Sequence, residues 1–490
     1  MRSTETGKGS VSVFLALILC VFLTLIFALL ESARFHAAKA VLERAAEGAM
    51  DSVLSGYQRE LYERYGLLFL DGGFGTGLSD PEMLEQEYSL WFEKNCGGSF
   101  VSLQLQTVRL QRTVTAADYS GELFRDSALR IERLLWEADS EGNASFSALS
   151  SQTERILTVL QAGEAAASVQ ADPGFSLSSD ASDTEAYRIL SAVRTISNRP
   201  LLQQALPAGT VLSGSILSEE GLPSREMRDA RTLPEEAHFS GTEGLTEGEE
   251  KHLYLSYLLD FFPCFSGEQD TFGLGCEAEY LAFGGRSDTD NLNTLLLRLY
   301  PALLGRNLRA ARNTPGILSE IAELSADCEE ETGQSEAVSE KLLWSYTKAE
   351  TLLELRTLLQ GGRIPYEKTE GSWVMRKAEI RNLSYGLFPA REHAEEMFSA
   401  VPGFSCEEVL RAILSQVLQE ELSYRAMDLI QENLRGQNSA FLMCSLIFGM
   451  DFEVRAAGEL LFAKQPVLQN TRESAVRMTL PAKTIRGSYR

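Results

Sequence analysis

The chain has 490 residues, 44% of them hydrophobic, which is enough for an extensive core and for two or more domains. It carries 69 acidic and 45 basic side chains, a formal net charge of −24. This charge disfavours nucleic acid and anionic surfaces as partners of the bulk of the chain.

Residues 11–30, "VSVFLALILCVFLTLIFALL", contain no charged side chain. A helix rises about 1.5 Å per residue, so this segment spans about 30 Å, the thickness of the hydrocarbon core of a bilayer. The apolar core of a cleaved signal peptide is shorter, roughly 7–15 residues, and a small-residue cleavage site follows it. We therefore predict a retained single-pass transmembrane helix in contact with lipid, with a cleaved signal as the alternative.

Residues 1–10 carry Arg2 and Lys8 against Glu5. Positively charged flanks stay in the cytoplasm, so we expect a cytoplasmic tip at 1–10 and an extracytoplasmic position for the rest of the chain. The predicted location is the cell membrane.

Residues 31–71 have the pattern of a helix that continues the transmembrane segment and ends at the glycine-rich "DGGFGTG". Its apolar residues form one stripe rich in alanine, which permits close approach of a second helix or sheet. We predict a helix interface on this stripe, and packing on the protein's own globular part is the alternative. The stripe comprises Ala38, Leu42, Ala45, Ala46, Ala49 and Val53.

Residues 72–137 are predicted to form the strand and helix of a first lobe. Leu103 and Leu105 alternate with Gln104 and Gln106, as in a half-buried strand, with a register change before Val108. The segment "DYSGELFRDSALRIERLLWEA" then has a helical pattern.

Residues 138–250 are rich in Ser, Glu, Gly and Pro, which predicts a partly disordered linker with one helix inside it, "QTERILTVLQAGEAAASVQ". Residues 251–490 are predicted to form a mainly helical lobe, with "AFLMCSLIFGM" among its helices. The segments "DFEVRAAGELLF" and "SAVRMTLPAKTI" are predicted terminal strands that pair with the strand near residue 103. The expected fold class is mainly α with a small antiparallel sheet (α+β).

Seven cysteines occur without a C-x-x-C pair, which argues against zinc. Cys264 and Cys276, on either side of a glycine-rich loop, form the candidate disulfide in an oxidising compartment. Buried thiols are the alternative for the remaining cysteines.

The four histidines fit no metalloprotease, serine-hydrolase or nucleotide-binding motif. We therefore predict no catalytic residue, no metal, no cofactor and no enzymatic activity. Asp288 and Asp290 lack the glycine and third ligand of a calcium loop, and Ser287 or Asp288 fits a helix cap instead. Trp373 and Tyr366 are interpreted as packed side chains, with a binding groove as the alternative.

Several blocks carry a family resemblance: "KGSVSVFLALIL", "MDSVLSGYQRELYERYGLLFLD", "CEAEYLAFGGRSDTDNLNTLLLRL" and "LSYRAMDLIQENLRG". The chain resembles an uncharacterised group of single-pass membrane proteins of Gram-positive bacteria, a domain of unknown function. Its N-terminus is similar to the minor pilin-like proteins of tight-adherence pilus systems, although Phe14 stands where processed pilins have glutamate.

This resemblance implies a structural or accessory role in a pilus or secretion assembly, with other proteins of that apparatus as partners. The alternative is an adhesive or ligand-binding cell-surface ectodomain without an assembly role.

Overall fold

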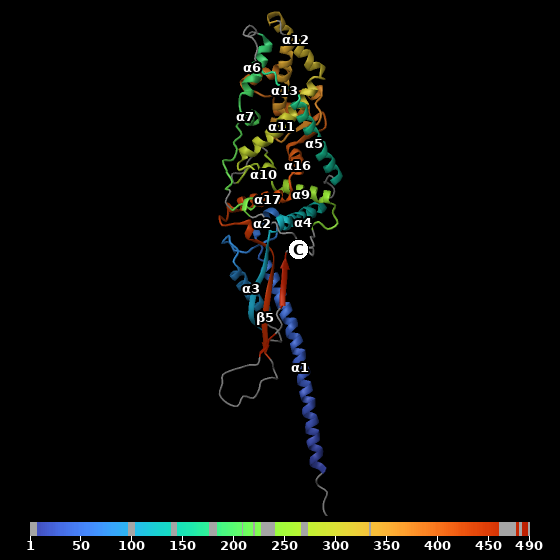
Figure 1. Cartoon of the computed structure of the whole chain (residues 1–490), viewed down its shortest axis with the longest axis vertical. Coiled ribbons are helices and arrows are strands. Elements are labelled where there is room, and N and C mark those ends of the chain that lie inside the picture. Colours follow the sequence, from blue (N-terminus) through green and yellow to red (C-terminus); the bar gives the residue numbers. More distant parts are fainter. Residues whose placement is uncertain are drawn as a thin grey trace, which may run out of the picture. The chain divides into compact units, whose positions relative to one another are not determined.

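The computed structural model describes residues 7–96, 103–138, 145–175, 184–207, 209–218, 221–226, 241–265, 273–332, 335–459, 477–479 and 483–488. It is mainly helical with a small antiparallel sheet, so the predicted α+β class is confirmed (Figure 1). The chain divides into unit 1, Met1–Asp118 with Ala440–Arg490, and unit 2, Tyr119–Ser439. The predicted lobes at 72–137 and 251–490 are therefore wrong, because strand pairing joins the two ends of the chain in one unit.

Unit 1 contains three helices and one sheet within its described residues. The central strand, β5, pairs antiparallel with β2 on one side and with β1, β6 and β7 on the other. In Figure 1 the long strands run beside α1. The elements are α1 Gly7–Leu54, α2 Arg59–Tyr65, β1 Leu70–Asp71, α3 Pro81–Cys96, β2 Leu103–Thr115, β5 Leu446–Glu459, β6 Arg477–Thr479 and β7 Lys483–Ser488.

The strand predicted near residue 103 is confirmed as β2, which pairs with β5 from Leu103↔Gly458 to Thr115↔Ile447. A register shift between Leu105 and Thr107 keeps the apolar residues on the core face on both sides of it, as predicted. The two terminal strands also exist, but β6 and β7 pair with β5 and not with β2.

Residues 440–450, predicted to be helical, are not a helix. A single 3-10 turn, Met443–Ser445, precedes β5, which begins at Leu446. A short apolar run suits a buried strand as well as a helix, and pairing with β1 and β2 decides between them.

The alanine-rich stripe of α1 lies inside unit 1. Each of its six residues is at most 2% exposed, and they pack with residues of α3 and β5. Tyr88 of α3 stacks on Phe452 with ring centroids 4.4 Å apart, and its hydroxyl donates to the backbone oxygen of Ala46 at 2.7 Å. The stripe is thus covered by the protein's own core, which corrects the predicted partner interface.

The helix predicted over 31–71 ends at Leu54. The chain turns at Gly56, and Gln58 then caps α2 by accepting from the backbone N–H groups of Glu60 and Leu61. The glycine-rich loop follows β1, where the carboxylate of Asp71 accepts from the backbone of Gly73 and Gly75.

Unit 2 is built from helices and one two-stranded sheet, β3 with β4, within its described residues. Its elements are α4 Glu122–Ala138, α5 Phe146–Ser168, α6 Glu185–Ser197, α7 Leu201–Ala205, α8 Pro223–Glu226, α9 Glu247–Phe261, α10 Glu277–Phe283, α11 Asp288–Ala311, α12 Pro315–Thr332, α13 Ser335–Leu359, β3 Arg363–Pro365, α14 Lys377–Asn382, α15 Arg391–Ser399, β4 Gly403–Ser405, α16 Cys406–Leu414 and α17 Gln419–Arg435.

The predicted linker over 138–250 is wrong for its described residues, because α5 and α6 belong to the core of unit 2. Ile156 of α5 and Ile189 of α6 are fully buried. Helices α5 and α11 pack at a glycine contact, where a Cβ on Gly305 would collide with the backbone oxygen of Gly163. The helix predicted inside this region is confirmed as α5.

Enlarging the stripe should disrupt unit 1. We expect Ala46→Leu to lower the free energy of unfolding of unit 1 by about 1–3 kcal/mol, because the added methylenes have no space in a closely packed core. Ala40→Leu is the matched control on the exposed face of the same helix. Hydrogen exchange of β5 in detergent-solubilised full chain measures the difference, and equal protection in both variants would contradict the packing described here.

Candidate functional site

The N-terminal half of α1 is exposed although it is apolar. Val11, Phe14 and Leu29 are 58%, 62% and 62% exposed, and the segment packs on no other described part of the chain. Within the described residues, α1 is the one helix long and apolar enough to cross a membrane. The helix continues without a break into its buried half, where Ala38 is the first fully buried residue.

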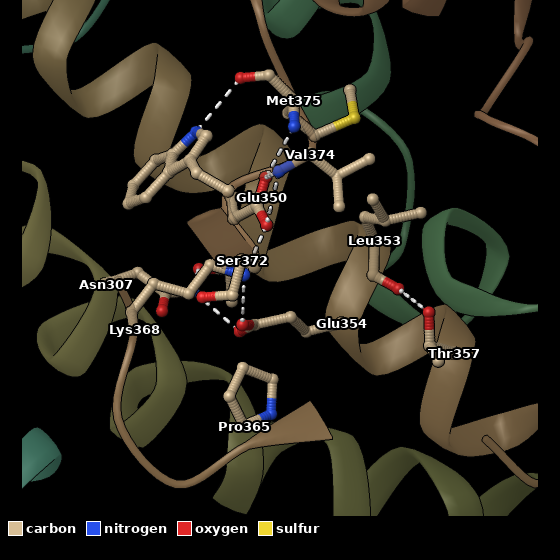
Figure 2. A network of polar contacts seen from close by, with 12 residues as sticks. Asn307, Glu350, Leu353, Glu354, Thr357, Pro365, Lys368, Ser372, Val374 and Met375 are labelled. Carbon is tan, nitrogen blue, oxygen red and sulfur yellow. Dashed lines mark hydrogen bonds and ion pairs between the residues drawn. The ribbon is translucent and has the colours of Figure 1, made fainter. Parts of the chain in front are cut away.

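The core of unit 2 encloses a group of paired charges (Figure 2). The ammonium of Lys368, in the loop after β3, lies 2.5 Å from a carboxylate oxygen of Glu350 and 3.0 Å from one of Glu354. All three side chains are 0% exposed. Glu350 and Glu354 are one turn apart on α13, so both carboxylates face the same side of that helix.

Helix α11 supplies the second cation. Arg306 donates to the other oxygen of Glu354 at 2.5 Å and to the backbone oxygen of Pro365 at 2.6 Å. The Asn307 amide also donates to Glu354, at 2.6 Å. Two carboxylates are thus balanced by two cations, and the group ties α11, α13 and the β3 loop together.

The backbone completes the group at Glu350. Its carboxylate accepts from the N–H groups of Val374, at 3.2 Å, and Met375, at 2.7 Å (Figure 2). Burial raises the pKa of Glu350, whereas at Glu354 burial is outweighed by Arg306 and Lys368, which lower its pKa. Each charge lies within 3.0 Å of an opposite charge, so the group acts as a clamp that joins α11, α13 and the β3 loop.

Sequence reasoning missed this clamp. The available signal was a pair of glutamates four residues apart inside the apolar run of α13, among residues such as Leu353. That pattern marks buried carboxylates, but it does not identify the cations, which come from residues 306 and 368.

Removing one cation should expose the cost of burying these charges. Lys368→Met should lower the free energy of unfolding of unit 2 by about 3–5 kcal/mol, because Glu350 and Glu354 lose a shared partner. Arg363→Met is the control, since Arg363 is 53% exposed and pairs with Glu408 at the surface, and its loss should cost less than about 1 kcal/mol. Urea unfolding of the full chain with hydrogen exchange of α13 tests this, and equal effects would refute the clamp.

Asp288 organises a second region of unit 2. Its carboxylate accepts from the Ser213 hydroxyl at 2.5 Å and from the backbone N–H groups of Gly275, at 2.9 Å, and Cys276, at 3.0 Å. Ser287 caps α11, as predicted, by accepting from the backbone of Asp290. Among the described residues, no group of three His, Cys, Asp or Glu side chains is placed to hold a metal ion.

The candidate disulfide is not formed, since Cys264 and Cys276 are both free thiols. Burial, with the carboxyls of Glu279 and Asp288 nearby, raises the pKa of Cys276 far above its ordinary value. Burial also raises the pKa of Cys264 to about 12. The prediction is therefore wrong, because both thiols are free in the folded protein, and burial keeps them protonated there.

Glu279 of α10 is a fully buried carboxyl group. One oxygen accepts from the backbone N–H of Phe265 at 3.1 Å, and the other has no hydrogen-bond partner among the described residues. Burial raises the pKa of Glu279 to about 7. The group is therefore protonated in mildly acidic solution and ionises near neutrality.

This ionisation should make unit 2 less stable as pH rises. Between the ordinary pKa of 4.5 and the folded-state pKa of about 7, the unfolded chain ionises first, so up to about 3 kcal/mol of stability is lost. Burial also raises the pKa of Glu132 of α4 to about 7, so Glu279→Gln should remove about half of the total loss and leave stability at pH 4.5 nearly unchanged. Urea unfolding at pH 4.5 and 8 measures it with Glu420→Gln, an exposed position on α17, as control. An undiminished loss in Glu279→Gln would show that other groups cause it.

The aromatic residues proposed for a groove are packed. Trp373 is 1% exposed and its indole donates to the backbone oxygen of Met375 at 3.0 Å. Tyr366 is 7% exposed, and Arg363 pairs with Glu408. The interpretation as packed side chains is therefore confirmed.

Together these observations define a mainly helical protein with clamped internal charges and one N-terminal helix able to span a membrane. Residues 179–458 match the model of a family of unknown function, DUF5702. The chain belongs to this family, and the match runs from the start of the α6 region to the end of β5. No curated protein and no solved structure matches the chain.

Proposed function

We propose that the protein is a membrane-anchored, extracytoplasmic structural or accessory component of a tight-adherence-type pilus or secretion assembly. In this proposal it acts by association with other proteins of the assembly and without catalysis. Its cytoplasmic part is the short N-terminal tip.

The continuity of α1 supports this proposal. One unbroken helix carries the apolar segment at 11–30 and the buried stripe of unit 1. A helix is stiff, so unit 1 follows any tilt or shift of the anchor. Adhesion requires only a flexible tether, whereas a structural component that transmits position from the membrane benefits from a stiff one.

The anchor also carries a face suited to association. Small side chains recur at four-residue steps along the exposed apolar half of α1, among larger Leu, Ile, Val and Phe residues. Small residues at this spacing let two helices approach closely in lipid, where no hydrophobic effect drives them together. These positions are Ser12, Ala16, Cys20, Thr24 and Ala28. Since the Ala38–Val53 stripe is occupied inside unit 1, we place the association on this membrane face.

A bulky residue on this face should break the association. Photo-crosslinking in cells from a residue in the 11–30 segment, followed by mass spectrometry, should yield another pilus or secretion protein. Ala16→Phe should reduce that crosslink about tenfold, which corresponds to a loss of about 1.4 kcal/mol. Ile18→Phe, on the opposite side of the helix, should leave it intact.

Both variants must stay in the carbonate-washed membrane fraction, which shows that the anchor still inserts. If inserted wild-type protein gives only lipid adducts, the assembly role is wrong and the adhesive alternative gains support. A crosslink insensitive to Ala16→Phe would instead place the association outside this helix face.

A further inference from the structure

Backbone pairing fixes the C-terminal end of helix α1 relative to the sheet of unit 1. Tyr57, just after α1, forms a bridge to Leu70, and Leu70 pairs with Ile447 of β5. The last turn of α1 and the start of β5 therefore lie side by side. From this point α1 runs back toward the apolar segment, and β5 runs beside it (Figure 1).

The two elements have matching lengths. From Leu54 back to Leu30, α1 spans about 36 Å at 1.5 Å per residue. From Ile447 to Glu459, β5 spans about 40 Å at 3.3 Å per residue. One core cluster joins them along this length, with Ala38 and Ala456 among its members. The end of β5 thus reaches the level of Leu30, which is the last residue of the apolar segment.

The sheet also has a charge opposite to that of the chain. Strands β2, β5, β6 and β7 carry six basic residues against three acidic ones, in a chain with a net charge of −24. At the end near Leu30, Lys39 of α1 is exposed, and so is Arg455 of β5, which pairs with Glu453 at 2.7 Å. An anionic surface would attract this end of unit 1, although it would repel most of the chain.

We infer that this end of the sheet rests on the lipid headgroups and forms a second membrane contact beside α1. We call it the membrane end of the sheet: Leu103 to Leu105 of β2, 456–459 of β5, and β6. The partner is an anionic phospholipid surface, and each exposed cation near it contributes about 1 kcal/mol at low salt. Two contacts fix both the tilt of α1 and the rotation of unit 1 about it. The inference rests on the membrane anchor of the proposed function.

Fluorescence quenching in vesicles can locate this end. The full chain carries a genetically encoded dansyl amino acid at exposed Gln104, at the membrane end, or at exposed Arg112, about 20 Å further along the sheet. The vesicles contain phosphatidylglycerol and a lipid with a nitroxide on its headgroup. Because nitroxide quenching acts over a short range, we expect at least about threefold more quenching at 104 than at 112.

A third label at Leu19, with a nitroxide on the acyl chain, separates the two hypotheses. If Leu19 is quenched and position 104 is no more quenched than 112, the anchor stands and the headgroup contact is wrong. If Leu19 is not quenched, the anchor itself fails, and the proposed function fails with it.

Charge reversal tests the lipid chemistry. Arg455→Glu should reduce quenching at 104 at least about twofold in anionic vesicles and leave it unchanged in phosphatidylcholine vesicles. Lys251→Glu, on α9 of unit 2, is the matched control and should change neither value. Quenching at 104 that is insensitive to Arg455→Glu in anionic vesicles would overturn attraction to anionic headgroups.

Discussion

The packing of α1 against α3 and β5 is the constraint on which unit 1 depends. One helix is shared between two environments: its first half is apolar on all sides and has no protein partner among the described residues, and its second half is buried on one face only. No turn separates the two halves, so the buried core of unit 1 begins within the same helix that carries the apolar segment. The Tyr88 contacts with Ala46 and Phe452 fix α1, α3 and the sheet to one another.

The elements of unit 2 are held together differently, by ion pairs that are buried away from water. Glu350, Glu354, Lys368 and Arg306 are all buried, and each is paired. Such a group need not add stability over apolar residues of the same size, but it strongly disfavours any arrangement that separates its members. It therefore selects one relative placement of α11, α13 and the β3 loop. Asp288 has the same effect on the loops around α10, through neutral donors.

Local periodicity predicted the parts of the fold that repeat over many residues. The alternation of Leu103 and Leu105 with Gln104 gave β2 and its register change, and Ser287 gave the start of α11. Composition was a poorer guide. The Ser- and Glu-rich region at 138–250 was predicted to be a linker, yet a few apolar positions such as Ile156 and Ile189 are enough to anchor α5 and α6 in the core. The frequent polar residues of such helices lie on their exposed faces and give no information about their buried faces.

The sequence by itself determined the apolar segment at 11–30, because an uncharged run of this length matches the thickness of a bilayer, and the segment is exposed in this fold. It also determined that one face of the following helix is buried. Only the tertiary structure decided what covers that face, which cations balance Glu350 and Glu354, and that the two ends of the chain share one sheet. The physical reason is that periodicity reports whether a side chain is removed from water, whereas its partner depends on contacts between residues far apart in the chain.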